Sequence, residues 1–448
     1  MDDASNGKPM ARSTIVELDK RFVWRPYTDM AAYIAGGDPL VIDRGEGIYL
    51  YDKDGSRYLD GCSSWWTASL GHQHPRLVKA LVEQATRLSH VAFAGVAHEQ
   101  ASVLAEALIK VAPEGLSRVF FTDNGSTSVE VAIKMAVQMW RQLGHPEKNR
   151  FITLDGAFHG ETIGATSLGG VEVFRRPFSD VVFDCIVVPS PAGGGYERAF
   201  QELSRVLRED ADSIAAVFIE PLVQGAAGMR TYSADYLRDL RSMCTRHDVL
   251  LIADEVFTGY GRTGTMWACD QADITPDLMC LGKTFASILP MGATLASERV
   301  FSAFGGGRDR ALLYGHTFSA NPLGARVALE VLKIIDEEQI ISRTQALSPL
   351  FATRIDAITK TKGVVAGRSL GMIGAVDLAE EGETLGDERE SYVRTVGWKV
   401  ADEARKRGVY LRPLGSTVYV CPPLIISESE LVWLLDQFAA SIEAALVL

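Results

Sequence analysis

Short apolar runs alternate with longer amphipathic stretches through the middle of the chain, and this alternation limits the possible folds more than any other feature. The runs rich in Val, Ile and Phe are typical of β-strands and lie at residues 117–123, 150–158, 184–189, 214–222 and 248–256. Helical patterns lie between several of them, for example at 126–143 and 233–247. Strands that alternate with helices form mainly parallel sheets, and strands that are apolar throughout are expected where helices cover both faces. The predicted fold class is therefore α/β.

The two ends of the chain have a different pattern. Residues 39–60 alternate apolar and polar side chains around the turn sequence DKDG, which is typical of a β-hairpin. After about residue 330, a helical segment is followed by hairpin-like pieces and a further helix. We predict a large central domain at residues 61–330 and a smaller α+β domain that is built from residues 1–60 and 331–448.

Charge and cysteine usage narrow the class of protein. Forty-five Lys and Arg against 57 Asp and Glu give the 448 residues a formal net charge of −12. A surface of this sign repels phosphate backbones and anionic lipid, which argues against a nucleic-acid or membrane-surface protein. The first 20 residues lack the basic start and apolar run of a signal peptide, so we expect a cytoplasmic protein. The six cysteines lie far apart without a CxxC pair, which favours reduced thiols over disulfides or a metal site.

A carboxylate pair and a lysine follow two of the apolar runs. Asp254 and Glu255 close one run, so at least one carboxylate is expected in a buried pocket, where it needs a partner to stay ionised. Lys283 follows the run PDLMCLG. Most lysines at such a position are surface cations, but in a desolvated pocket the amine has a depressed pKa and serves as a Schiff-base nucleophile. Pyridoxal phosphate (PLP) is the cofactor that needs both groups, a lysine for its aldehyde and a carboxylate for its ring nitrogen.

The segment DNGSTSVEVAIKMA places a turn before an amphipathic helix. Gly125 allows a tight turn, and Ser126 and Thr127 bring hydroxyl and N–H groups to the helix N-terminus, where anions bind. Simple N-capping without a ligand explains the same pattern. The lysine and the buried acid elsewhere in the sequence favour a phosphate-binding site over capping alone.

The segment AFHGETIGA follows the next predicted strand. Phe158 could lie flat on a pyridine ring, with His159 beside it. Taken alone, an aromatic–histidine pair on a loop more often serves ordinary packing.

Together these motifs resemble the class III (omega-type) aminotransferases. The resemblance rests on GSTSVEVAIKMA, FHGET, ADEVFTGYGRTG, LGK and HTFSANPLG, and it runs over nearly the whole chain. It implies the fold type I PLP architecture, with Lys283 as the lysine that binds the cofactor and Asp254 as the partner of its ring nitrogen. Gly125 and Ser126 would hold the phosphate. Thr317 would reach the phosphate in a neighbouring subunit, which implies a homodimer with shared active sites.

A second set of motifs concerns the substrates. WRPYTDM, GCSSWWTASLGHQHP and LRPLGSTVYVCPP resemble the branch of the family that serves biotin biosynthesis. That branch implies an acceptor with a long apolar chain that ends in a carboxylate. Aromatic side chains would line the pocket that holds such a chain, and an arginine would bind its carboxylate. The alternative is that the tryptophans belong to the core and that the arginine forms a surface ion pair. The substrate-binding residues that the resemblance implies are Tyr27, Trp65, Trp66, Gly315, Arg412 and Tyr419.

The segment FHGET departs from the YHGDT that this branch often carries. Phe158 lacks a hydroxyl, and Glu161 is one methylene longer than aspartate, which changes any contact with the ammonium of the amino donor. S-adenosylmethionine and lysine therefore both stay open as donors.

Three other functions fit part of the pattern. An omega-amine aminotransferase with a pyruvate-type acceptor would share every cofactor residue. A PLP aminomutase or decarboxylase would bind the cofactor at Lys283 without exchanging amino groups between two substrates. A binding protein that has kept the fold would not need the complete set of Asp254, Lys283, the phosphate turn and Thr317.

Overall fold

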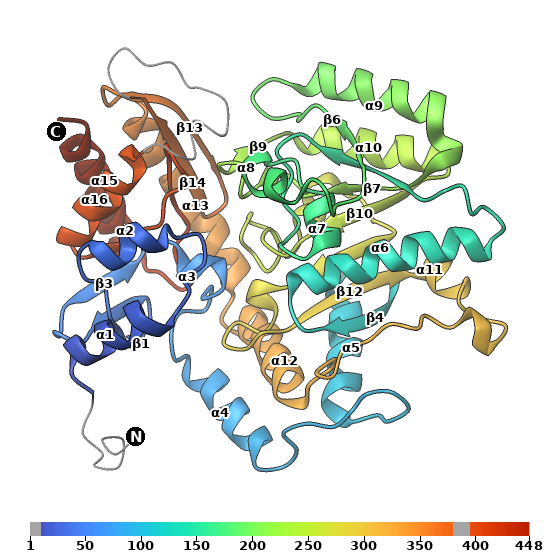
Figure 1. Ribbon diagram of the computed structural model, residues 1–448, viewed down its shortest axis with the longest axis horizontal. Coiled ribbons are helices and arrows are strands. Elements are labelled where there is room, and N and C mark those ends of the chain that lie inside the picture. Colours follow the sequence, from blue (N-terminus) through green and yellow to red (C-terminus); the bar gives the residue numbers. More distant parts are fainter. Residues whose placement is uncertain (1–9, 380–394, 448) are drawn as a thin grey trace.

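The computed structural model describes residues 10–379 and 395–447, and its larger part is built on a seven-stranded sheet (Figure 1). The strand order is β4-β12-β11-β10-β7-β5-β6, and β12 runs antiparallel to both of its neighbours. The strands are β4 (Leu116–Thr122), β5 (Arg150–Leu154), β6 (Ile186–Val188), β7 (Ile214–Ile219), β10 (Leu250–Asp254), β11 (Leu278–Leu281) and β12 (Gly292–Ser297). The predicted α/β class with a mainly parallel sheet is confirmed.

Both faces of this sheet are covered, because successive strand residues belong alternately to two apolar clusters. Phe218 on β7 packs in one cluster with residues of α6 (Gly125–Gln142), whereas Val217 packs in the other with residues of α10 (Ala234–Arg246). Helices of the second cluster also include α5 (Glu99–Val111), α9 (Tyr196–Asp210) and α12 (Pro322–Glu337). Burial on both faces explains why the predicted strands are apolar throughout. Shorter elements of this part are α4 (Pro75–Ala85), α7 (Ile163–Ser167), α8 (Glu172–Arg175), α11 (Glu298–Ser302), β8 (Val223–Gln224) and β9 (Arg230–Thr231).

A smaller part combines the two ends of the chain. One sheet has the order β1 (Ile42–Glu46), β2 (Tyr49–Asp52), β3 (Arg57–Asp60) and β15 (Val409–Tyr410), and β15 pairs in parallel with β3. The predicted hairpin around DKDG is the antiparallel pair β2–β3. A second sheet contains β13 (Val364–Leu370), β14 (Ile373–Leu378) and β16 (Thr417–Val420). The accompanying helices are α1 (Arg12–Phe22), α2 (Met30–Ala35), α13 (Ile340–Ile358), α15 (Val396–Lys406) and α16 (Glu428–Val447).

The division into domains at residues 60 and 330 stays a prediction. Asp60 is the last residue of β3, whereas residue 330 lies inside α12. Residues 1–9, 380–394 and 448, which the predicted small domain includes, lie outside the described residues.

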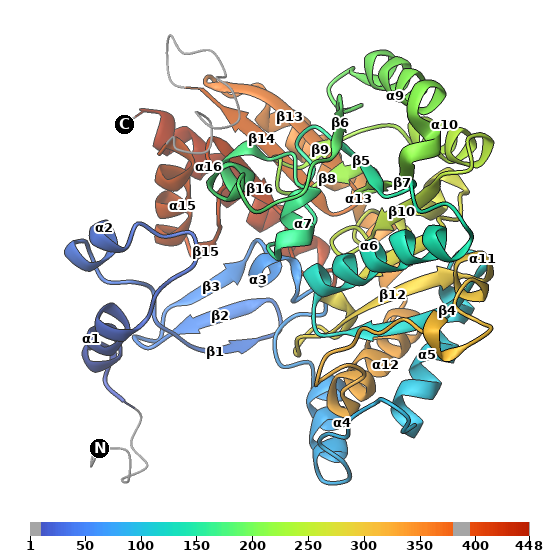
Figure 2. The same cartoon turned by 45° about the vertical axis from the view of Figure 1, so that its right-hand side comes forward.

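The carboxyl ends of the strands bring the predicted site residues together. β10 ends at Asp254, β11 ends two residues before Lys283, and β4 ends three residues before Gly125. Strands that run in the same direction end at one edge of a sheet, and this edge is where ligands bind in α/β proteins. The short turn α3 (Ser63–Trp66) lies at the junction between β3 and the large sheet in both views (Figure 2).

Candidate active site

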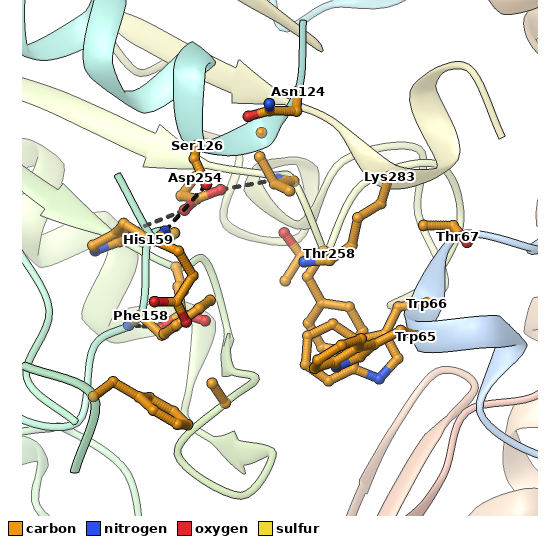
Figure 3. Close-up of a pocket in the computed structure, with 18 of the residues that line it drawn as sticks. Trp65, Trp66, Thr67, Asn124, Ser126, Phe158, His159, Asp254, Thr258 and Lys283 are labelled. Carbon is orange, nitrogen blue, oxygen red and sulfur yellow. Dashed lines mark hydrogen bonds and ion pairs between the residues drawn. The ribbon is translucent and has the colours of Figure 1, made fainter. Parts of the chain in front are cut away.

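A cavity of about 440 Å³ lies at this edge of the sheet (Figure 3). Its wall combines the loops that follow the strands of the large sheet with the turn α3 and the segment that precedes α2. Figure 3 shows Trp65 and Trp66 near Lys283, across the cavity from Phe158 and His159. The predicted site residues that line this cavity are Tyr27, Trp65, Trp66, Gly125, Ser126, Phe158, His159, Asp254 and Lys283.

Asp254 has both carboxylate oxygens engaged at the end of β10. Its Oδ1 accepts a hydrogen bond from the N–H of Val256 (3.0 Å), and its Oδ2 lies 2.8 Å from Nδ1 of His159. Burial lowers the pKa of His159, but the hydrogen bond and the charge of Asp254 outweigh it, so the net pKa of His159 is raised. The structure thus places His159 on the cavity wall as the partner of Asp254.

Glu255, the other carboxylate of the predicted pair, points elsewhere. Its oxygens accept hydrogen bonds from the hydroxyl of Thr258 and the N–H of Cys269, and it does not line the cavity. Burial raises the pKa of Glu255 to about 7.

Lys283 lies in an apolar setting with strained backbone geometry. Its φ is +48°, and its Nζ lies 4.7 Å from the ring centre of Trp66 and 5.6 Å from that of Phe257. Burial lowers the pKa of the Lys283 amine, while the negative charges of Asp254 and Glu220 oppose that shift in part. The neutral amine, which is the nucleophilic form, is therefore more populated than on an ordinary lysine.

The turn before α6 leaves one hydroxyl available at the helix N-terminus. Asn124 is the N-cap: its side chain accepts the N–H of Thr127 (3.0 Å), and Oγ1 of Thr127 accepts the N–H of Asn124 (3.0 Å). Ser126 is not used for capping and instead accepts the N–H of Glu161 at 3.2 Å. A Cβ at Gly125 would come within 2.7 Å of Val256, so glycine is required by this close approach. Capping therefore does not use Ser126, and the phosphate site predicted at Gly125 and Ser126 stays a prediction.

Glu220 is a buried site residue that the sequence analysis did not single out. It follows β7, and its two oxygens accept the N–H of Phe158 (3.0 Å) and the N–H of Gly225 (2.8 Å). Burial raises its pKa to about 7, against the opposing influence of His159. The signal that could have found it is the same as for Asp254, an acid that closes an apolar strand. Other lining residues that were missed are Ser64, Thr67, Asn124, Gly160, Phe174, Ala226, Val256, Phe257, Thr258 and Leu414.

An aromatic group lies at the outer end of the cavity. Tyr27 and Trp65 meet edge to face at 5.4 Å, and the Tyr27 hydroxyl donates a hydrogen bond to Glu161. The guanidinium of Arg412 lies 4.6 Å from the ring centre of Trp65 and 5.7 Å from that of Trp398. Arg412 thus packs against the aromatic wall and does not itself line the cavity.

The remaining predicted residues lie away from the cavity. Tyr419 is buried behind Trp66, with ring centres 6.0 Å apart. Gly315 and Thr317 are exposed on the loop between α11 and α12. His316 of this loop lies 2.8 Å from Asp123, which places the loop beside the turn that precedes α6.

Four consecutive residues beside the cavity have a strained backbone. Ser63, Ser64, Trp65 and Trp66 have φ of +47°, +46°, +65° and +73°. For residues with a side chain, this left-handed conformation costs roughly 1–2 kcal/mol each. Such strain persists only where the surrounding contacts enforce it, and it is common at functional sites.

Comparison with known proteins identifies the family. The Aminotransferase class-III family matches residues 33–442. The chain belongs to this family. It is 40% identical to the adenosylmethionine-8-amino-7-oxononanoate aminotransferase of Geobacter sulfurreducens, over 96% of this chain and 97% of that protein. The protein of the same name from Aquifex aeolicus is 37% identical, over 96% of this chain and 97% of its own length.

Solved structures of aminotransferases have the same fold. The crystal structure of adenosylmethionine-8-amino-7-oxononanoate aminotransferase from Methanocaldococcus jannaschii superimposes with a TM-score of 0.92 and 32% identity, covering 97% of this chain and 99% of that one. The omega transaminase of Pseudomonas jessenii in complex with PMP gives 0.88 and 32%, covering 96% and 98%. This class III aminotransferase is therefore a PLP-dependent enzyme that acts on small molecules, as predicted.

The residues around the cavity fit PLP. A lysine, a buried carboxylate and a helix N-terminus with an available serine hydroxyl meet in one space, and these are the groups that an aldehyde, a ring nitrogen and a phosphate require. Nε2 of His159 is buried and has no hydrogen-bond partner within residues 10–379 and 395–447. Among those residues, no helix combines the length and the apolar character that crossing a membrane demands.

Proposed function

We propose that this aminotransferase transfers an amino group to 8-amino-7-oxononanoate, with S-adenosylmethionine as the amino donor, in the cytoplasm. The observation that carries the proposal is the aromatic wall of Tyr27, Trp65 and Trp66, which extends from Lys283 toward Arg412. The acceptor is a nine-carbon chain with a ketone near one end and a carboxylate at the other, and it matches this layout. Relatives of 32–40% identity carry the name of this activity.

Arg412 is suited to the acceptor carboxylate. Aromatic rings of Trp65, Tyr27 and Trp398 surround its guanidinium at 4.6–6.0 Å. Within the part of the chain that the structure describes, no acidic side chain forms an ion pair with it. A guanidinium that is held in place and still has its hydrogen-bond donors available binds a carboxylate in a bidentate manner.

Lys283 moves the proton in this reaction. PLP, when bound, supplies an aldehyde that condenses with amines and a ring that withdraws electrons from the carbon next to the nitrogen. Because burial lowers the pKa of Lys283, its Nζ can accept a proton from the substrate carbon and donate it again. The apolar faces of Trp66 and Phe257 exclude water from Nζ, and this burial contributes to the lowered pKa of the amine.

Asp254, His159 and Glu220 orient the other end of the site. Asp254 would hold a proton at the ring nitrogen, and His159 keeps its carboxylate in one orientation through the 2.8 Å contact. Glu220 fixes the backbone of Phe158, so that this ring can stack on the cofactor. Gly125 and Ser126 would hold the phosphate.

The outer pocket meets the amino donor. Glu161 accepts a hydrogen bond from Tyr27 and lines the cavity, where its charge would attract a donor ammonium. The aromatic faces beside it would attract a sulfonium cation, an interaction worth roughly 0.5–2 kcal/mol. Lysine as donor to the same acceptor is the alternative.

We also infer a homodimer in which Gly315 and Thr317 serve the active site of the partner. Their loop carries two exposed apolar side chains, Leu313 (88% exposed) and Phe318 (57%), and Trp24 near the N-terminus is equally exposed (88%). Exposed apolar side chains that lie together on one surface are typical of protein–protein interfaces.

Two half-reactions test the proposed substrates. S-adenosylmethionine and lysine are added separately, without acceptor, while the visible absorbance of the PLP-loaded protein is followed. Loss of absorbance with S-adenosylmethionine, and its return with 8-amino-7-oxononanoate, is expected. Loss with lysine alone reassigns the donor. If neither donor acts, or if pyruvate but not 8-amino-7-oxononanoate restores the absorbance, the enzyme is a general omega-amine aminotransferase.

A further inference from the structure

The turn α3 is one turn of left-handed helix made entirely of residues with side chains. Ser63, Ser64, Trp65 and Trp66 follow one another at positive φ. The N–H of Trp66 donates to the carbonyl of Cys62 (2.9 Å), and the N–H of Thr67 donates to that of Ser63 (2.9 Å). Only glycine adopts this conformation without strain, so neighbouring groups must enforce it here.

Asp60 is the group best placed to do so. It is fully buried at the end of β3 and does not line the cavity. Its Oδ1 accepts the N–H of Cys62 (3.3 Å), and its Oδ2 accepts the hydroxyl of Ser64 (2.7 Å) and lies 2.9 Å from Nε2 of His72. One buried carboxylate thus binds the start and the middle of the turn.

A second anchor comes from the opposite side. The hydroxyl of Ser63 donates to the carbonyl of Cys421 (2.7 Å), which follows β16. The guanidinium of Arg262 lies within hydrogen-bond distance of the same hydroxyl (3.4 Å). The turn is therefore held between the two sheets of the smaller part and a loop of the larger part.

The turn decides where both tryptophans point. Trp66 is buried, tilted against Phe257 at 4.5 Å, and its ring lies 4.7 Å from Nζ of Lys283. Trp65 is 37% exposed and meets Tyr27 and Arg412. In an extended chain, two successive side chains would point to opposite sides, and only one could line the cavity. The left-handed turn brings both onto one wall.

We propose that Asp60 and Ser64 are positioning residues for the acceptor, because they hold the left-handed turn that presents Trp65 and Trp66 to its apolar chain. The proposal rests on the proposed function. When the turn loosens, the acceptor loses its wall and its Michaelis constant rises. The turnover number changes less, because Asp254 is untouched and Phe257 still covers Nζ of Lys283.

The substitution Ser64→Gly distinguishes an effect on the position of Trp65 and Trp66 from an effect on the stability of the fold. Glycine tolerates the positive φ, so the fold is preserved, but the hydrogen bond to Asp60 is lost and the turn becomes flexible. We expect the KM for 8-amino-7-oxononanoate to rise about tenfold or more, the kcat to change less than about threefold and the melting temperature to stay nearly constant.

Asp52→Asn is the matched control. Asp52 also holds a turn of this part, since its Oδ1 accepts the N–H of Asp54 (3.0 Å) and of Ser56 (2.8 Å). The control is expected to lower the melting temperature without changing the KM for the acceptor.

A spectroscopic readout tests the turn directly, independently of the reaction. The PLP-loaded enzyme is labelled with 5-fluorotryptophan, and the fluorine resonances of Trp65 and Trp66 are assigned from Trp65→Phe and Trp66→Phe. Ser64→Gly is expected to shift or broaden these two resonances alone.

The proposal requires that Ser64→Gly both raises the KM for the acceptor and changes the fluorine resonances of Trp65 and Trp66. A KM within about twofold of the wild type, or unchanged resonances, overturns it. If Ser64→Gly does not fold, Asp60→Asn is judged by the same two readouts. If the wild type does not aminate 8-amino-7-oxononanoate, the proposed function fails, while the fluorine spectra still decide whether Ser64 holds the turn.

Discussion

Nδ1 of His159 lies 2.8 Å from Oδ2 of Asp254, and both side chains are buried at the base of the cavity. The pair joins the loop after β5 to the end of β10, two strands that are separated by β7 in the sheet. The carboxylate that we propose for the cofactor ring is therefore oriented by a residue from a different loop, through an interaction that raises the pKa of the histidine.

Replacing His159 is expected to weaken cofactor binding. In His159→Asn the charge-assisted hydrogen bond to Asp254 is lost, which costs roughly 1.5–3 kcal/mol, or about ten- to a hundredfold in the Kd for PLP. Equilibrium dialysis of the apoenzyme against PLP measures this. His145→Asn, at an exposed histidine that pairs with Glu147 on the surface, is the control and should leave the Kd unchanged. Equal affinity in both variants would contradict the role of the pair.

Lys283→Ala is expected to abolish amino transfer. Without Nζ, the proton at the substrate carbon loses the acceptor that we propose for it, and general acid–base catalysis contributes about 10²–10⁴-fold. Single-turnover kinetics with PLP and donor measure the loss. Lys134→Ala, on the helix α6, removes a lysine outside the cavity and is the control. Amino transfer by Lys283→Ala at an appreciable fraction of the wild-type rate would refute the mechanism.

Glu220 makes the stability of the apoenzyme depend on pH. Its pKa in the folded state is about 7, whereas the pKa of an ordinary glutamate is 4.5. A raised carboxyl pKa stabilises the fold below the unfolded pKa, and this contribution, up to about 3 kcal/mol, is lost as the pH rises through about 7.

Compared with Glu220→Gln, the wild-type apoenzyme should therefore lose stability between about pH 5 and pH 8. Thermal unfolding midpoints across this range measure the difference. Glu255 has a similar pKa of about 7 in both proteins, so its effect cancels. A constant difference between the two proteins would show that Glu220 is ionised throughout.

Arg412 should discriminate the acceptor by its carboxylate. Arg412→Met keeps an apolar side chain but removes the guanidinium. The KM for 8-amino-7-oxononanoate should then rise about tenfold or more, while the KM for the donor changes little. The methyl ester of the acceptor tests the same contact in the wild type and should lose a similar factor. Additive losses from the variant and the ester would mean that the carboxylate binds elsewhere.

Restoring the residues of YHGDT at positions 158 and 161 should change the preference for the amino donor. Phe158→Tyr combined with Glu161→Asp supplies a hydroxyl and shortens the acid, so the KM for S-adenosylmethionine is expected to fall by up to about tenfold. Competition between S-adenosylmethionine and lysine in one reaction measures the shift. An unchanged ratio of the two donors would show that neither position contacts the ammonium.

Local motifs were predictable because their residues act within a few positions of one another. Gly125 is required next to a helix start by the close approach of the Val256 side chain, and Lys283 lies two residues after an apolar strand. The order of strands and helices predicted the α/β fold for the same reason, since periodicity reports which faces are buried. Glu220 carried the same signal as Asp254, an acid at the end of an apolar strand, and was missed because such a signal alone does not say which acid turns inward.

The amino-acid sequence alone determined the class of fold and the cofactor, and it predicted the main residues that would hold this cofactor, because hydrophobic periodicity and short motifs specify local conformation. Only the tertiary structure decided that Asp254 faces the cavity while Glu255 turns away, that Arg412 packs on the aromatic wall, and that Ser63–Trp66 wind left-handed. These features depend on contacts between residues far apart in the chain, such as Ser63 with Cys421. A strained turn is adopted only where such distant contacts offset its cost, and no local pattern reports them.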